Sequence, residues 1–289
     1  MSPEAKQYVS AAAFRQALEN RLLSELPKSG VPLERLRKRV AFDRLLARLF
    51  DGEPESSPKW LLKGGYSMEI RYSNIARMTK DVDLTVPVFN NPTPEKIREL
   101  LANSAEKDLG DWFVFLVGPY SKELLQAVYG GWRYSVTATL AGRNFTGFHV
   151  DVGVGDAMIS APDWETGSGL LSFAGIAPVR AALLPIEQHF AEKIHSFTIP
   201  RPAAANSRVK DFVDLALLIE NGLPDAKLVR KAVEATFARR QTHPAPEVLP
   251  APPTAWEKPY AAMAADCGVK HKELNEAAKY IAEYWKTLP

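Results

Sequence analysis

Residues 60–86, WLLKGGYSMEIRYSNIARMTKDVDLTV, form the stretch that decides the fold. The pattern predicts a strand over Trp60–Leu62, a glycine turn, a short helix and a second strand that carries Asp81 and Asp83. Because strand side chains alternate between two faces, both carboxylates point to one face, roughly 6.5–7 Å apart at the backbone. Asp81 and Asp83 are therefore predicted to bind a divalent metal ion. The alternative is a pair of solvent-exposed aspartates on an edge strand.

The glycine turn offers a second functional element. Gly64 and Gly65 stand directly before the predicted helix, where backbone N–H groups and the positive end of the helix suit a phosphate. Ser67 adds a hydroxyl near the helix start, and Lys63 precedes the turn, although its side chain can also point away. A simple tight turn is the alternative, and the spacing of a P-loop is absent. A phosphate cradle upstream of a carboxylate pair indicates nucleotide chemistry.

Asp151 is the third candidate carboxylate. In FHVDVGV, residues 148–154, it interrupts an apolar strand and shares a face with His149. If this strand lies beside the Asp81 strand, three carboxylates surround one site, which can hold two Mg²⁺ ions. Asp151 would then take the proton from an attacking hydroxyl. The alternative is a structural aspartate that caps a bulge.

A lysine and two aspartates on later helices form a third candidate group. Lys193 lies on a mostly apolar helix, and Asp211 and Asp214 share one face of the next helix because they are three residues apart. A lysine that faces a carboxylate on the next helix can bind triphosphate, with Asp214 orienting it. The alternative is a structural salt bridge or a helix cap. His189 and His195 are expected to pack rather than react.

Composition limits the class of protein. The 289 residues are 46% hydrophobic and 24% charged with a net charge of +2, which is ordinary for a globular protein with a core. Any nucleic-acid partner must therefore be held by a local basic patch. The single cysteine excludes an intramolecular disulfide, no apolar run of membrane-spanning length exists, and the N-terminal residues show no secretion signal. We expect a cytoplasmic protein with no membrane partner.

The chain divides into two predicted parts. Residues 1–175 contain two helices, over residues 10–50, and then a mixed sheet, in which Gly142-Arg143-Asn144 signals a hairpin turn. Residues 176–289 read as helical, and residues 243–259 hold six prolines in 17 residues, which predicts an extended strap. The cationic side chains of the second helix are expected to face solvent, and contact with RNA is the lesser alternative. These residues are Arg35, Arg37, Lys38, Arg39, Arg44 and Arg48.

The motifs and their order along the chain resemble those of a known family, the AbiEii/AbiGii nucleotidyltransferase toxins, which include MenT-like toxins of toxin–antitoxin systems. The resemblance spans about residues 33–220 and is weaker in the C-terminal portion. Many DNA polymerase β-like nucleotidyltransferases share the glycine turn and the Asp-x-Asp pair. The later helix with Lys193 and the helix with Asp211 and Asp214 restrict the resemblance to the AbiEii/AbiGii family. The motifs that carry the resemblance are KGGYSMEIR (63–71), RMTKDVDL (77–84), HVDV (149–152), AEKIHSFT (191–198) and SRVKDFVDLALL (207–218).

The resemblance assigns roles to individual residues. It implies metal ligands at Asp81, Asp83 and Asp151, nucleotide-phosphate contacts at Gly64, Gly65 and Ser67, and a catalytic lysine and aspartate at Lys193 and Asp214. Thr79 stands at a hydroxyl position that is often serine in relatives, and its extra methyl group puts that role in doubt. We count Lys63 and Lys80 with the nucleotide-binding residues.

The resemblance also implies a fold and an activity. The fold is α/β, a DNA polymerase β-like nucleotidyltransferase sheet with N-terminal helices and a C-terminal helical region. The activity is that of a cytoplasmic toxin with a cognate antitoxin, which uses Mg²⁺ to transfer NMP from an NTP to RNA, in characterised relatives to the 3′ end of tRNA. Pyrophosphate would leave and translation would stop. RNA is expected to cross the basic residues Arg77, Lys80, Arg208, Lys210, Arg239 and Arg240.

Two alternatives stay open. One is a nucleotidyltransferase that modifies a small molecule such as an aminoglycoside, which needs the same carboxylates and an acidic acceptor pocket. The other is a non-catalytic RNA- or protein-binding module with a degenerate site.

Overall fold

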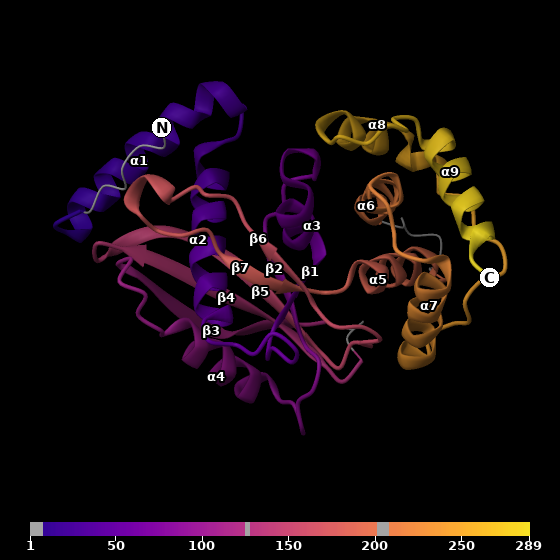
Figure 1. Ribbon diagram of the computed structural model, residues 1–289, viewed down its shortest axis with the longest axis horizontal. Helices are drawn as coiled ribbons and strands as arrows, with labels where there is room; N and C mark the ends of the chain where they lie inside the picture. Colours follow the sequence, from indigo (N-terminus) through magenta and orange to yellow (C-terminus); the bar gives the residue numbers. More distant parts are fainter. Residues whose placement is uncertain (1–7, 125–127, 201–207) are drawn as a thin grey trace.

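The computed structural model describes residues 8–124, 128–200 and 208–289. Within them, the N-terminal part is built on a seven-stranded mixed sheet with the order β3-β4-β5-β2-β1-β7-β6 (Figure 1). Strands β2 and β5 run parallel, and β1 runs antiparallel to β2. The strands are β1 Leu61–Lys63, β2 Val82–Val86, β3 Phe113–Glu123, β4 Gly131–Leu140, β5 Arg143–Val154, β6 Asp163–Thr166 and β7 Arg180–Leu183.

Helices surround this sheet and form the C-terminal part, which confirms the predicted α/β fold class. Figure 1 shows α5 to α9 gathered at one end of the sheet. None of the helices in the described residues is long and apolar enough to cross a bilayer. The helices are α1 Ala11–Ser29, α2 Leu33–Phe50, α3 Gly64–Tyr72, α4 Pro94–Ala105, α5 Ile186–Thr198, α6 Val209–Glu220, α7 Ala226–Arg240, α8 Glu257–Asp266 and α9 Leu274–Thr287.

Helices α2 and α4 cover one face of the sheet. Phe42 of α2 packs edge-on against Phe148 of β5, with ring centroids 4.9 Å apart, and the Tyr134 hydroxyl of β4 donates to the Pro94 carbonyl of α4 over 2.8 Å. Because side chains alternate along β5, the buried face takes Phe148 and every second residue after it, and Asp151 points to the opposite face. That opposite face is left for the functional site.

Local sequence signals set several of these elements. The predicted hairpin between β4 and β5 is present, but its turn is Ala141-Gly142, at φ 53° and 67°, so Arg143 and Asn144, which were predicted in the turn, belong to β5. Helix α4 begins at Pro94, and the Thr93 hydroxyl before it accepts a hydrogen bond from the Lys96 N–H. Both connections follow from residues that favour these turn and cap geometries.

Other predicted boundaries were wrong. Strand β3 continues to Glu123 because it pairs with β4 along its length. Strand β7 was missed, since four residues beside β1 carry no alternating pattern of their own. Helix α8 begins at Glu257, inside the predicted proline strap.

Two hydrophobic clusters divide the molecule. The first joins α1, α2, α4 and the sheet and extends to Leu184, and the second joins α5 to α9 from Phe190 onward. Met68 of α3 belongs to the second cluster and links the two parts. The clusters thus meet between Leu184 and Phe190, while the domain boundary at residue 175 stays a prediction.

The prediction that the cations of α2 face solvent was wrong for Arg44 and Arg48. Both side chains are buried against Asp111, with Arg44 Nε 2.6 Å from one carboxylate oxygen and Arg48 Nη2 2.5 Å from the other. Arg48 also donates to the Phe113 carbonyl over 2.8 Å. An aspartate far along the chain turns two apparent surface cations into a buried ion-pair network, because burying a charge requires a partner.

Candidate active site

Four charged residues lie side by side on adjacent strands and form what we call the charged row: Lys63, Asp83, Asp151 and Arg133. Lys63 of β1 is in register with Asp83 of β2, Asp83 with Asp151 of β5, and Asp151 with Arg133 of β4. Residues directly opposite each other in a sheet point to the same face. The strand of Asp151 thus lies beside the strand that carries Asp83, as the prediction of a shared carboxylate site requires.

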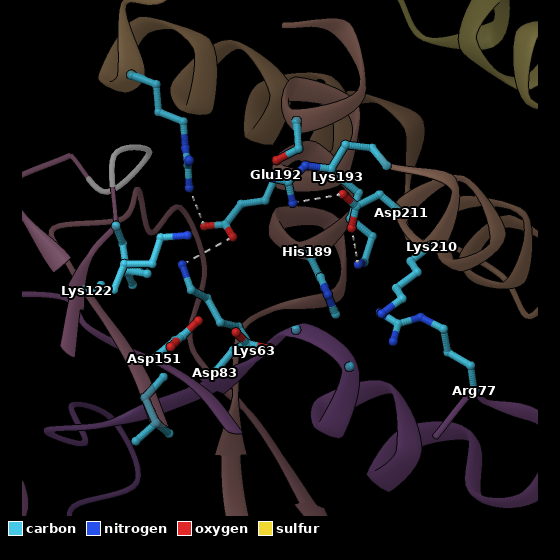
Figure 2. A pocket seen from close by; sticks show the side chains of 18 of the residues that line it. Lys63, Arg77, Asp83, Lys122, Asp151, His189, Glu192, Lys193, Lys210 and Asp211 are labelled. Carbon is cyan, nitrogen blue, oxygen red and sulfur yellow. Dashed lines mark hydrogen bonds and ion pairs between the residues drawn. The ribbon is translucent and has the colours of Figure 1, made fainter. Parts of the chain in front are cut away.

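A cavity of about 500 Å³ opens above the charged row (Figure 2). Its walls come from β1, β2 and β5, from the first residues of α3, and from α5 and α6. Figure 2 shows Lys63, Asp83 and Asp151 on one side and Lys193, Asp211 and Lys210 on the other. The structure thus brings together residues that are up to 177 positions apart in the sequence, from Lys63 to Arg240.

The glycine turn is required by close packing. Gly64 begins α3 at φ 64°, and a Cβ there would lie 2.0 Å from Asp83 Oδ2. A Cβ at Gly65 would lie 2.9 Å from the Thr79 side chain. The backbone at the start of α3 therefore lies directly against the carboxylate, and no other residue type fits at Gly64. Both glycines line the cavity as predicted for a phosphate site.

Ser67 and Thr79 support this turn from behind. Ser67 is buried, and its hydroxyl donates to the Gly64 carbonyl over 2.9 Å. The Thr79 hydroxyl donates to the Asp81 carbonyl over 3.3 Å, and its N–H donates to Glu69. Neither side chain is among those that line the cavity. Their predicted contacts with nucleotide stay predictions, as does that of the exposed Lys80.

The three predicted metal ligands occupy different surroundings. Burial raises the pKa of Asp83 to about 6, and the nearby Asp151 carboxylate adds to this, while Lys63 opposes it. Asp151 accepts two hydrogen bonds from Arg133, 2.7 and 2.8 Å long. Asp81 lies just before β2, outside the residues that line the cavity, with an oxygen 3.5 Å from Arg133 Nη2. Asp83 and Asp151 converge, and Asp81 is held to one side.

Asp83 and Asp151 fit a divalent cation. Over the residues that the structure describes, no group of three metal-ligating side chains is close enough to hold an ion by itself. Mg²⁺ is usually bound through one or two carboxylates, with substrate phosphates completing its coordination. Two carboxylates in register meet this requirement, because a cation relieves the repulsion that raises the pKa of Asp83. Asp81 as a third ligand stays a prediction.

Arg133 is the main site residue that the sequence did not indicate. Counting back from the hairpin turn, where Leu140 pairs with Arg143, places Trp132 opposite Asp151. A one-residue register shift after Ala138 instead brings Arg133 to that position. The signal for this bulge is not visible in the strand pattern.

The predicted pairing of Lys193 with Asp214 is present. Lys193 Nζ lies 2.7 Å from Asp214 and 3.2 Å from Asp211. Arg77 also binds both Asp214 oxygens, at 3.0 and 2.9 Å. Burial by itself would raise the pKa of Asp214, but Lys193 and Arg77 hold it well below its usual range. The Asp214 carboxylate therefore fixes two cations on the cavity wall.

Lys63 takes part in a second network, which ties the sheet to the helices. It forms ion pairs with Asp156 and with Glu192, the latter at 3.4 Å. Arg240 closes the network, 3.0 Å from Asp156 and 3.2 Å from Glu192. Although burial raises it, Lys63 and Arg240 lower the pKa of Asp156 to about 2. This network fixes α5 and α7 against the end of β5.

The predicted basic RNA path is only partly exposed. Arg77 and Arg240 are engaged in the networks above, and Arg239 lies over the Tyr129 ring at 4.7 Å and donates to the Gly155 carbonyl. Each of these three guanidinium groups has partners within the protein, and their contact with RNA stays a prediction. Arg208 lies 3.4 Å from Asp211. The remaining lysines, Lys80 and Lys210, are exposed.

Comparison with known proteins places this arrangement in context. The sequence model of a family described as "Nucleotidyl transferase AbiEii toxin, Type IV TA system" matches residues 44–284. The solved structure of MenT4, a nucleotidyltransferase toxin from Mycobacterium tuberculosis H37Rv, is similar at 16% identity and a TM-score of 0.56, over 97% of this chain and 99% of that chain. This likeness shows a shared fold.

Two further comparisons add little. The antibiotic-resistance factor ANT(2'')-Ia is similar at 16% identity over 78% of this chain and 92% of that chain, but its TM-score of 0.32 is too low to show a shared fold. No curated protein matches the chain.

Proposed function

Because the chain belongs to the AbiEii family of nucleotidyltransferase toxins of type IV toxin–antitoxin systems, we propose that it transfers a nucleoside monophosphate from an NTP to the 3′ end of RNA, with tRNA as the acceptor. The observation that carries this proposal is the charged row, which sets two carboxylates beneath a glycine turn and opposite Lys193. A cognate antitoxin is the expected partner, and blocked acceptor ends would stop translation in the cytoplasm.

The residues divide the work between donor and acceptor. The N–H groups at Gly64 and Gly65 would bind phosphate at the start of α3. Asp83 and Asp151 would hold Mg²⁺, which supplies charge stabilisation to phosphoryl oxygens when bound, with Asp81 as the third predicted ligand. Lys193, oriented by Asp214, would neutralise the terminal phosphates.

The transfer itself forms one bond and breaks another. The 3′-oxygen of the acceptor attacks the α-phosphorus, the bond from that phosphorus to the bridging oxygen breaks, and pyrophosphate leaves. Asp151 takes the proton of the attacking hydroxyl. Arg133 donates two hydrogen bonds to Asp151 and so fixes the direction of its carboxylate.

The charge of the cavity favours RNA over a small cationic acceptor. Lys122 and Lys210 are exposed and line the cavity, so a polyanionic strand would meet cations at its mouth. An aminoglycoside, the rival acceptor, needs an acidic pocket, whereas seven cationic side chains and five carboxylates line this cavity. Binding that weakens steeply as salt rises would support the RNA acceptor.

The test is incubation of the purified protein with Mg²⁺, total tRNA and each labelled NTP in turn. We expect label on tRNA from wild type and none from Asp83→Asn. Asp266→Asn, which changes an exposed aspartate outside the cavity, is the matched control and should label as wild type. Label on tRNA that survives Asp83→Asn would remove the proposed role of the charged row. No label on tRNA from any of the four NTPs would overturn tRNA as the acceptor.

A further inference from the structure

His189 is a buried side chain of the cavity wall that the proposed reaction does not yet use. It lies on α5 with only 2% of its surface exposed, and it lines the cavity. Neither of its ring nitrogens has a hydrogen-bond partner among the residues described. Figure 2 shows the ring directed from α5 into the space between Lys63 and Arg77.

An imidazole buried without partners is unusual, because buried polar groups are normally hydrogen-bonded. His195, on the same helix, has a partner for one ring nitrogen, since its Nε2 lies 2.7 Å from the Thr242 hydroxyl while its Nδ1 has none. His189 faces the cavity instead of a protein acceptor or donor. A partner for its ring is therefore expected from whatever occupies the cavity.

The surroundings indicate the charge of that partner. His189 stands four residues before Lys193 and so shares a helix face with it. Burial lowers the pKa of His189 well below its usual range, and Lys193 and Arg71 lower it further. The ring is thus a neutral hydrogen-bond donor among cations, an arrangement that suits an anion and that adds no further positive charge.

We propose that His189 is a ligand-binding residue, whose ring N–H donates to the terminal phosphates of a bound NTP beside Lys193. This inference rests on the proposed function, because it takes an NTP as the occupant of the cavity. The terminal phosphates are preferred to the base because His189, Lys193 and the start of α3 at Gly64 line one cavity. His189 would act with Lys193 on the leaving pyrophosphate.

The test separates a ligand contact from a packing role. His189→Phe fills similar space without a donor, and His189→Gln restores an N–H group. We measure binding of an NTP analogue with a non-hydrolysable α,β link, and of the matching NMP, by calorimetry with Mg²⁺. We expect His189→Phe to lose about tenfold in triphosphate affinity with NMP affinity unchanged, and His189→Gln to recover most of the loss. His195→Phe is the control and should bind as wild type.

A second readout does not depend on variants that must fold. Addition of inorganic triphosphate to wild type should shift the ¹⁵N imidazole signals of His189 in NMR and leave those of His195 in place. Wild type that binds the NTP analogue with no change at His189, together with wild-type affinity in His189→Phe, would overturn this inference alone. Wild type that binds neither NTP analogue nor inorganic triphosphate would overturn the proposed function as well.

Discussion

Asp83→Asn should make the protein more stable while it abolishes transfer. The pKa of Asp83 is raised from 3.8 to about 6, chiefly by burial and then by Asp151, so the ionised carboxylate is unfavourable in the folded state. A tenfold change in proton affinity corresponds to about 1.4 kcal/mol, so at pH 7.5 the ionised group costs about 3 kcal/mol of the free energy of unfolding. Asparagine removes the charge and keeps the shape.

The sign of the pH dependence follows from the same values. Between pH 3.8 and about 6 the folded protein binds a proton that the unfolded chain has released, so this group lowers stability as the pH rises through that window. The advantage of Asp83→Asn should therefore shrink to about 1 kcal/mol at pH 4.5. For the same reason, Mg²⁺ binding by wild type should weaken as the pH drops below about 6, where Asp83 of the metal-free protein takes up its proton.

The assay is urea unfolding followed by tryptophan fluorescence, at pH 4.5 and 7.5 in EDTA. Asp266→Asn, with its exposed side chain, should leave the unfolding midpoint unchanged at both pH values. An Asp83→Asn protein no more stable than wild type at pH 7.5, or equally stabilised at both pH values, would refute the reasoning that this charge is held at a cost for function.

Three other substitutions test separate parts of the structure. Gly64→Ala should abolish transfer, because its Cβ would meet the Asp83 carboxylate. Gly142 also has a positive φ but open space around it, so Gly142→Ala should lower the free energy of unfolding in urea by only about 1 kcal/mol and keep activity. Equal effects of the two substitutions would contradict the close packing at Gly64. Asp111→Ala should lower the free energy of unfolding by about 3–5 kcal/mol, because it leaves two buried arginines of α2 unpaired; a loss below about 1 kcal/mol would show that the network carries little stability. Arg133→Gln should tighten Mn²⁺ binding in calorimetry, because it frees the Asp151 oxygens; weaker binding would mean that Arg133 orients the carboxylate for the metal.

Short-range patterns predicted much of the fold. The β4–β5 hairpin and the alternation in β5 depend on residues a few positions apart, and both appear in the structure. The glycine turn before α3 and the helix face shared by Asp211 and Asp214 are of the same kind. Strand β7 and the start of helix α8 were not predicted, because their pairing and packing partners define them and their own sequences do not.

The sequence by itself determined which residue types are available: three candidate carboxylates on strands, a glycine turn, and a helix with a lysine followed by a helix with two aspartates. Only the tertiary structure decided which of them meet. Cross-strand register places Lys63, Asp83 and Asp151 in one row, and a one-residue bulge brings Arg133 there instead of Trp132. Spacing along the chain fixes the face on which a side chain lies, but the partners of a buried charge come from distant segments, and burial makes those partners necessary.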